Sequence, residues 1–242
     1  MRILITNDDG IYAEGVLPLV KWAQTKGEVV VVAPKVEQSG KSHGIEIHKS
    51  FEAKQVDLLP GVTAWAVDST PADCMRLAIL GMNMDVDLVI SGINRGLNIG
   101  RDIMYSGTVS AVFEAGNLGV NGLAVSTSPA YFAHAAEQMD KIWDYFVRYD
   151  LFSKNSMYNV NIPTGGSDCF RVTRQGGNYY SDTFSPQEND MYLPCGIDVF
   201  APCVNSEFDT DAVLVDKVIS VMPLTMDRTD LALYRTLKEQ EL

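Results

Sequence analysis

Two adjacent carboxylates, Asp8 and Asp9, follow the first apolar run of the chain, and Gly10 lets the backbone turn after them. A strand that stops at such a pair delivers both charges to one end of a sheet. Because two carboxylates this close repel unless a cation lies between them or one binds a proton, the pair suggests half of a divalent-metal site. The alternative is an ordinary turn, since Asn, Asp and Gly favour turns through local hydrogen bonds and positive φ angles.

A polar loop, residues 34–44, follows the second predicted strand and contains Ser39, Lys41, Ser42 and His43. In an open parallel sheet, the carboxyl ends of the strands form the edge where ligands bind. We therefore expect this loop to lie beside the acidic pair, with its hydroxyl and basic side chains available to a cleft. The alternative is a solvated surface loop with no role in binding.

A glycine-rich segment, residues 91–100, follows a third predicted strand and contains Asn94 and Asn98. Asn94 stands just beyond the strand end, where an amide oxygen is able to reach a metal ion. Its alternative role is a turn residue in the left-handed conformation, which Asn tolerates well. Arg95 beside it is either a phosphate contact or a solvated loop residue.

The sequence Ser106-Gly107-Thr108 precedes a run of helical residues. A turn of this kind presents free backbone N–H groups and the positive end of a helix dipole, which together make an anion site. The alternative is plain capping of the helix by Ser106 or Thr108, which needs no ligand.

The elements that must position these groups are short apolar strands alternating with helices. This alternation predicts an α/β fold, a Rossmann-like three-layer αβα sandwich with a mostly parallel sheet. The predicted strands are 3–5, 28–33, 62–67, 87–92, 121–127, 157–162 and 218–223, and residues 45–56 suggest a further hairpin or strand pair. The predicted helices are 13–26, 70–82, 106–115, 130–149 and 230–242, the last with Leu231, Tyr234, Leu237 and Leu242 on one stripe.

The chain divides by composition near Pro163. We expect residues 1–163 to form the catalytic core and residues 164–242 to form a C-terminal part with a projecting hairpin, an arm and a terminal helix, all within a single-domain architecture. The segment 210–216 fits neither helix nor strand clearly.

Composition excludes several classes of function. The net charge of −12 over 242 residues repels a nucleic-acid backbone, so polymeric DNA or RNA is not an expected partner. Four scattered cysteines and three histidines without zinc-ligand spacing argue against a zinc cluster and fit a reducing compartment. Neither a dinucleotide-binding nor a P-loop glycine pattern is present. Because we find no signal peptide and no apolar run long enough to span a membrane, a cytoplasmic protein is expected.

Taken in order, the motifs resemble those of the SurE family of survival-protein nucleotidases. The resemblance extends from the first strand to about residue 225 and is carried by the whole series of motifs. These are residues 5–11 (ITNDDGI), 39–42 (SGKS), 70–74 (TPADC), 91–98 (SGINRGLN), 105–109 (YSGTV), 159–163 (NVNIP) and 210–213 (TDAV).

The resemblance implies a phosphomonoesterase (a 5′-nucleotidase) that needs a divalent metal and dephosphorylates nucleoside monophosphates, with 3′-monophosphates and short polyphosphate as further substrates in some members. It implies one ion per subunit, Mg²⁺ or Mn²⁺ with Ca²⁺ as a further option, and homodimers or homotetramers with exchanged C-terminal arms. Carried over by position, the metal ligands are Asp8, Asp9, Ser39 and Asn94, and the phosphate contacts are Ser106, Gly107, Thr108 and Asn98.

These ligands are all hard oxygen donors, which favour Mg²⁺, Mn²⁺ or Ca²⁺ over zinc or copper. We expect metal-assisted attack by water, with Asp8 or Asp9 orienting the water, over an aspartyl-phosphate route, because no D-x-D spacing is present. Adjacent residues of an extended strand point to opposite faces, so the pair shares a metal only if the strand ends before it. Two rival classes are a non-catalytic nucleotide-binding module and a phosphatase for another small phosphomonoester.

Overall fold

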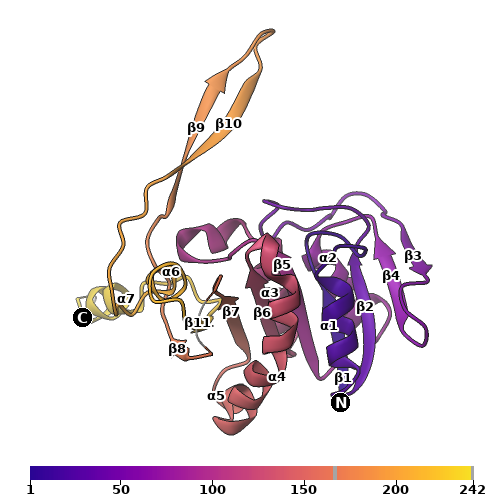
Figure 1. Cartoon of the computed structure of the whole chain (residues 1–242). Helices are drawn as coiled ribbons and strands as arrows, with labels where there is room; N and C mark the ends of the chain where they lie inside the picture. The colour runs from indigo at the N-terminus through magenta and orange to yellow at the C-terminus, as the bar shows by residue number, and fades with distance from the viewer. Residues whose placement is uncertain (166–167, 241–242) are drawn as a thin grey trace.

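The computed structural model describes residues 1–165 and 168–240, and its centre is one nine-stranded, mostly parallel sheet (Figure 1). The strand order is β3-β4-β2-β1-β5-β6-β7-β11-β8. The six parallel strands of the centre are β1 (Arg2–Thr6), β2 (Glu28–Pro34), β4 (Thr63–Val67), β5 (Leu88–Arg95), β6 (Asn121–Thr127) and β7 (Met157–Ile162). Beyond them, β3 (Ala53–Val56) pairs antiparallel with β4, and β11 (Ile219–Pro223) pairs antiparallel with β7. The last strand, β8 (Phe170–Val172), pairs parallel with β11.

Helices cover both faces of this sheet, which confirms the predicted layered α/β fold. The central strands alternate buried apolar residues between the two faces: Ile3 and Ile5 belong to one core and Leu4 to the other. The first core packs against α1 (Val16–Ala23) and α4 (Phe132–Arg148), and the second against α2 (Pro71–Arg76) and α3 (Gly107–Asn117). Among the described residues, no helix is long and apolar enough to cross a membrane.

Several predicted elements have different limits. Helix α1 starts at Val16 and ends at Ala23, inside the predicted 13–26, because turns occupy the residues before it: Ala13 N–H donates to Gly10 O at 2.9 Å. In the predicted strand pair 45–56, only β3 forms. Side chains satisfy the backbone there instead, since Glu46 N–H donates to Asp73 Oδ2 at 2.9 Å and His48 N–H to Glu46 Oε1 at 2.7 Å.

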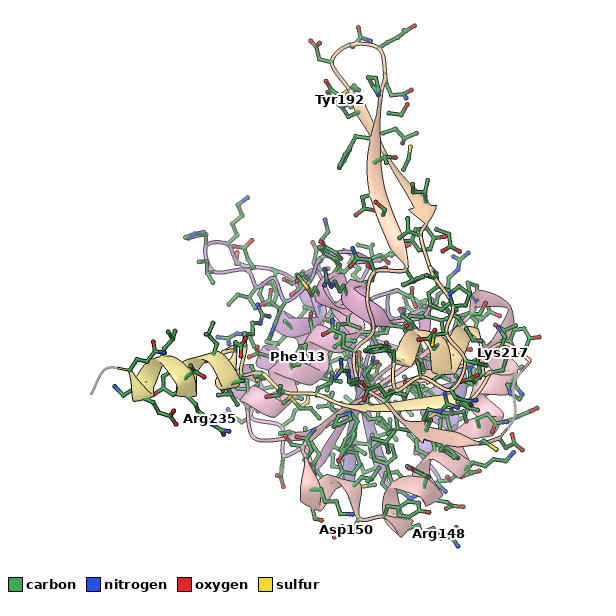
Figure 2. The ribbon with its side chains drawn as sticks, turned by 90° about the vertical axis from the view of Figure 1, so that its left-hand side faces the viewer. Phe113, Arg148, Asp150, Tyr192, Lys217 and Arg235 are labelled. Carbon is green, nitrogen blue, oxygen red and sulfur yellow. The ribbon has the colours of Figure 1, made fainter. Side chains whose placement is uncertain are left out.

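The C-terminal third adds two strands to the sheet and then leaves the body of the molecule. The segment 210–216 is largely helical, as α6 (Asp209–Leu214). The predicted projecting hairpin is present as β9 (Tyr180–Pro186) and β10 (Tyr192–Asp198), a separate two-stranded sheet that stands away from the body (Figure 1). Helix α7 (Leu231–Glu239) extends in another direction, and Figure 2 shows Arg235 on it and Tyr192 on the hairpin far from the central sheet. Leu242, placed on the stripe of this helix, lies outside the described residues.

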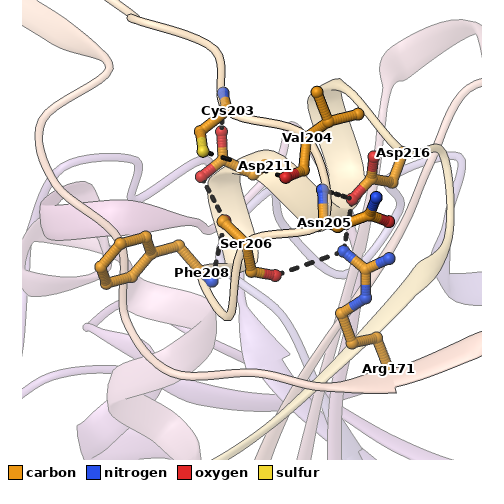
Figure 3. A network of polar contacts seen from close by, with 8 residues as sticks. All are labelled: Arg171, Cys203, Val204, Asn205, Ser206, Phe208, Asp211 and Asp216. Atoms are coloured by element: carbon orange, nitrogen blue, oxygen red, sulfur yellow. Dashed lines mark hydrogen bonds and ion pairs between the residues drawn. The ribbon is translucent and has the colours of Figure 1, made fainter.

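A polar network anchors the segment that follows the hairpin, residues 203–206, to the body (Figure 3). The Arg171 guanidinium pairs with Asp216 and donates to Ser206 O at 3.3 Å. Asp211 accepts from Cys203 N–H at 2.8 Å and from the Ser206 hydroxyl. The hairpin therefore projects from a base that is tied to both β8 and α6.

Candidate active site

The acidic pair lies at the carboxyl edge of the sheet, where β1 has already ended. Because β1 stops at Thr6, the alternation of an extended strand no longer separates the two side chains. The Asp8 carboxylate faces the start of α3, and the Asp9 carboxylate faces the end of β5, where Oδ2 accepts from Arg95 N–H at 2.9 Å. The condition for a shared ion, a strand that ends before the pair, is met.

Asp8 is buried, with 4% of its surface exposed, and lies against the N-terminus of α3. Its Oδ2 accepts from Gly107 N–H at 3.1 Å, and its Oδ1 accepts from the Thr108 hydroxyl. Burial raises the pKa of Asp8 above its usual range, and the hydrogen bonds from Thr108 and Gly107 oppose that rise. At the start of α3, a backbone N–H and a hydroxyl thus bind a carboxyl group of the chain itself.

Asp9 is half-buried, and burial is also the main cause that raises its pKa, to about 6. The hydrogen bond from Arg95 N–H lowers the pKa, while the charges of Asp8 and Glu37 raise it further. Burial and mutual repulsion make the charged forms of these carboxylates unfavourable, and a cation bound to them would stabilise those charged forms.

Asn94 reaches this edge because β5 is irregular there. The register between β5 and β6 shifts between Ser91 and Asn94, and Gly92 takes a φ of 145° where a side chain would meet Val125 O at 2.4 Å. Asn94 itself is a buried strand residue without positive φ, so the left-handed turn is wrong as its alternative role. Its Nδ2 donates to Gly96 O at 2.8 Å, so the amide oxygen of Asn94 points away from Gly96 O.

Ser39 is the most loosely held of the four predicted metal ligands. Its loop passes directly beside the pair, since Gln38 N–H donates to Asp8 O at 2.7 Å. The Ser39 side chain is exposed, however, and its hydroxyl donates to Glu37 Oε1 at 2.7 Å. The structure brings Asp8 and Asp9 together with the C-terminal end of β5 and the N-terminus of α3. It places Ser39 at the rim of this group.

Ser106 caps α3, as the simpler interpretation of this turn predicted: its hydroxyl accepts from Val109 N–H at 3.1 Å. Capping and anion binding are compatible here, because different groups perform them. Gly107 must be a glycine for this contact, since a Cβ would lie 2.8 Å from Asp8 Cβ and 2.9 Å from Asp8 Oδ2. Asn98 is buried nearby, and its Nδ2 donates to Ser126 Oγ at 2.8 Å.

Three contacting residues were not suggested by sequence. Glu37 holds the Ser39 hydroxyl, and its only sequence signal is a carboxylate two residues before a predicted ligand. Glu114 is buried on α3 and accepts from Arg76 at 3.1 Å, with His43 Nε2 at 2.7 Å, so it ties the Ser39 loop to the helix. Asn161 binds the backbone of Asn98, a contact that joins residues 63 positions apart and is invisible to local patterns.

A cavity of about 690 Å³ lies beside the Ser106-Gly107-Thr108 turn. Tyr105 and Phe113 line it, together with Thr225, Asp227 and Arg228 of the segment leading to α7. None of the predicted metal or phosphate residues lines this cavity.

The donors at the sheet edge suit a hard divalent cation. Within residues 1–165 and 168–240, no three His, Cys, Asp or Glu side chains are grouped as a metal cluster. The predicted site has only two carboxylates and completes its ligand set with a hydroxyl and an amide oxygen, and all four are the oxygen ligands that Mg²⁺ and Mn²⁺ take. The raised pKa values of Asp8 and Asp9 show that burial disfavours their charged forms, which a cation would stabilise.

Comparisons with known proteins point to the same family that the sequence motifs resemble. The family described as "Survival protein SurE" matches residues 3–182. The chain is 37% identical to the 5′-nucleotidase SurE of Alkaliphilus metalliredigens, over 100% of this chain and 99% of that protein. It is 36% identical to the 5′-nucleotidase SurE of Caldanaerobacter subterraneus subsp. tengcongensis, over 94% and 92%. The crystal structure of the SurE protein from Aquifex aeolicus superimposes with a TM-score of 0.79 at 30% identity, over the full length of both chains.

Proposed function

The chain belongs to the SurE family, and on that premise we propose that it is a 5′-nucleotidase, a phosphomonoesterase that releases phosphate from nucleoside 5′-monophosphates. One observation of the structure carries the assignment to this site. The N-terminus of α3 holds a carboxyl oxygen of Asp8 with a backbone N–H and a hydroxyl, directly beside the carboxyl group of Asp9. This edge combines anion donors with hard oxygen ligands, the two things that a metal-assisted phosphatase needs.

Asp8, Asp9 and the amide oxygen of Asn94 would hold one Mg²⁺ or Mn²⁺ ion, with Ser39 completing the set from the rim. When bound, the ion supplies polarisation of a phosphoryl oxygen and lowers the pKa of water. In this structure the N–H of Gly107 and the hydroxyl of Thr108 donate to Asp8. When the ion holds the Asp8 carboxylate, these two donors would turn to the phosphoryl oxygens as their charge changes toward the transition state, where such donors contribute most. Asp9 faces the open side of the site and orients the attacking water.

The proposal is tested with a panel of phosphomonoesters, assayed for released phosphate with Mg²⁺ and with Mn²⁺. The panel contains 5′-AMP, 5′-GMP, 3′-AMP, glucose 6-phosphate and a short polyphosphate, and runs beside Asp8→Asn, Asp9→Asn and the control Asp140→Asn. Asp140 is a surface residue of α4 paired with Lys26, and its replacement leaves activity unchanged. We expect 5′-nucleotides to be the best substrates and both site variants to lose activity.

Three outcomes separate the alternatives. Binding of nucleotides without release of phosphate, with any metal, would identify a non-catalytic binding module. Faster hydrolysis of glucose 6-phosphate or polyphosphate than of any nucleotide would identify a phosphatase for another substrate. Full activity of Asp8→Asn would refute the role of the pair and leave the enzyme class in place.

We also propose that the protein forms homodimers or homotetramers by exchanging C-terminal arms. In support, α7 buries none of its residues, and about half of the surface of Leu231, Leu233, Tyr234 and Leu237 is exposed. A second copy of the chain offers a matching apolar surface in the cavity walls at Phe113 and Leu224. Light scattering of the full chain, compared with a chain ending at Asp227, tests this. We expect the full chain to form a dimer or tetramer, and the same number of chains per particle after truncation would refute the exchange.

A cytoplasmic location is proposed as well. Cys74, Cys169, Cys195 and Cys203 are all unpaired, which suits a reducing compartment. The net charge of −12 supports small nucleotides over nucleic-acid polymers as partners. Fractionation of cells that produce the native protein is the corresponding test, and recovery outside the cytoplasm would refute it.

A further inference from the structure

Strand β7 carries two buried amides where a central strand normally carries apolar side chains. Asn159 and Asn161 are both 0% exposed and point to the same face of the strand, while Val160 between them belongs to the apolar core. Burying an amide is costly unless it forms hydrogen bonds. The contacts of these two side chains therefore show what they are for.

Both amides bind the backbone of one residue, Asn98. Asn161 pairs with it at two points: its Oδ1 accepts from Asn98 N–H at 2.8 Å, and its Nδ2 donates to Asn98 O at 2.9 Å. Asn159 Nδ2 donates to the same carbonyl oxygen at 2.8 Å. Asn161 thus replaces the partner that a neighbouring strand would provide, at a point of the chain where no strand runs.

This clamp holds the middle of the loop that joins the two halves of the candidate site. Gly96 N–H donates to Thr127 O at 2.8 Å, and Gly100 N–H donates to the Asp209 carboxylate at 3.0 Å. Between these two anchors, the bonds of Asn98 to Asn159 and Asn161 hold the backbone of the loop. The loop follows β5, which carries Asn94 next to its last residue, and leads to Ser106, so we expect a shift at residue 98 to affect both.

The stability of the fold alone does not explain an asparagine at position 159. Its Oδ1 is buried and has no hydrogen-bond partner among the described residues, which is unfavourable. An apolar side chain of similar size would avoid that cost. The contact that Asn159 does make is directed at Asn98, which indicates a role in placing that residue.

We propose that Asn159 and Asn161 are positioning residues for phosphate release: they fix the backbone of Asn98, and through it the Asn98 amide and the loop between Asn94 and Ser106. This inference rests on the proposed nucleotidase function. Neither residue touches the reacting atoms in this account, so their loss should lower kcat more than it raises KM.

The test compares Asn161→Leu and Asn159→Leu with the matched control Asn155→Leu. Asn155 stands just before β7, at its opposite end, and its Nδ2 also donates to two backbone carbonyls, Met157 O at 2.6 Å and Leu224 O at 3.0 Å. Melting temperature, kcat and KM for 5′-AMP are measured at saturating Mn²⁺, with folded fractions checked by circular dichroism.

We expect Asn161→Leu to lower kcat by about 10- to 100-fold, the scale of a misplacement of about 1 Å in an active site. Asn159→Leu removes one of the three hydrogen bonds and should lower kcat by a smaller factor, with KM changed less than kcat in both. Asn155→Leu should lower the melting temperature while kcat stays within about twofold of the wild type.

Equal losses of kcat in Asn155→Leu and Asn161→Leu would mean that the amides are only structural, and the proposal would fail. Folded Asn159→Leu with wild-type kcat and KM would overturn it as well, and that variant decides the question if Asn161→Leu does not fold. An inactive wild type would refute the proposed function and this inference with it, whereas an active wild type with active variants refutes the inference alone.

Discussion

Replacement of Gly107 by alanine tests the contact on which the site is built. The added Cβ would lie 2.8 Å from Asp8 Cβ and 2.9 Å from Asp8 Oδ2, whereas ordinary contacts start at 3.4 Å. The Asp8 side chain or the start of α3 must therefore move by roughly 0.6 Å or more, and the buried carboxylate has little space for this. Alanine is a better helix former than glycine, and Gly107 lacks a positive φ, so the backbone itself is not strained.

The expected result is a fall of about 10- to 100-fold in kcat/KM for 5′-AMP, because displacements of this size misalign reacting groups. The melting temperature should change by only a few degrees, about the effect of 1 kcal/mol in a domain of this size. Gly177→Ala is the control, since a Cβ there meets nothing within 4 Å and its φ is not positive. If Gly107→Ala keeps kcat/KM within threefold of the wild type while folded, Asp8 does not need its place on α3 and the reasoning is refuted.

Three further predictions concern the metal, the Ser39 loop and the base of the hairpin. Chelation with EDTA should abolish phosphate release and added Mn²⁺ should restore it; activity that survives chelation would contradict the oxygen-ligand site. Glu114→Gln should destabilise the fold by about 1–3 kcal/mol at pH 7, measured by urea denaturation, because it weakens the bonds to His43 and Arg76. The hydrogen bonds of His43 and then Arg76 lower the pKa of Glu114 below 4.5 in the folded protein, so these contacts stabilise the fold above pH 4.5. The difference in stability between the variant and the wild type should therefore vanish as the pH falls through the pKa of the folded state. A difference that stays constant with pH would contradict this. Asp209→Ala should cost about 1–3 kcal/mol or more, because the N–H groups of Gly100, Gly176 and Thr210 lose their buried acceptor; an unchanged urea midpoint would show that water replaces it.

Local patterns are sufficient for the central strands of the sheet and for helix α3, which Ser106 caps. The limits predicted for β6 and β7 agree with the structure, although β7 carries Asn159 and Asn161 among its apolar residues. The hydroxyl-glycine-hydroxyl turn allows either a cap or an anion site; the cap is present, since Ser106 accepts from Val109 N–H, and the N–H of Gly107 donates to Asp8.

The remaining features depend on contacts between residues far apart in the chain. Helix α6 was ambiguous because its first residue, Asp209, serves as an acceptor for Gly100 and Gly176, 109 and 33 residues away. Residues 45–52 were expected to pair as strands, but the Asp73 side chain binds their backbone from across the chain. The clamp of Asn161 on Asn98 has the same origin, since a buried Asn in a strand shows no local sign of which backbone it binds.

The most direct measurement of the central claim is anomalous diffraction from crystals grown with Mn²⁺ and soaked with phosphate. The account predicts one manganese peak per chain, coordinated by Asp8, Asp9 and Asn94, with a phosphate that accepts from Gly107 N–H and the Thr108 hydroxyl. A peak at another place in the molecule, or a phosphate bound away from the N-terminus of α3 while Asp8 keeps its bonds to Gly107 and Thr108, would contradict it.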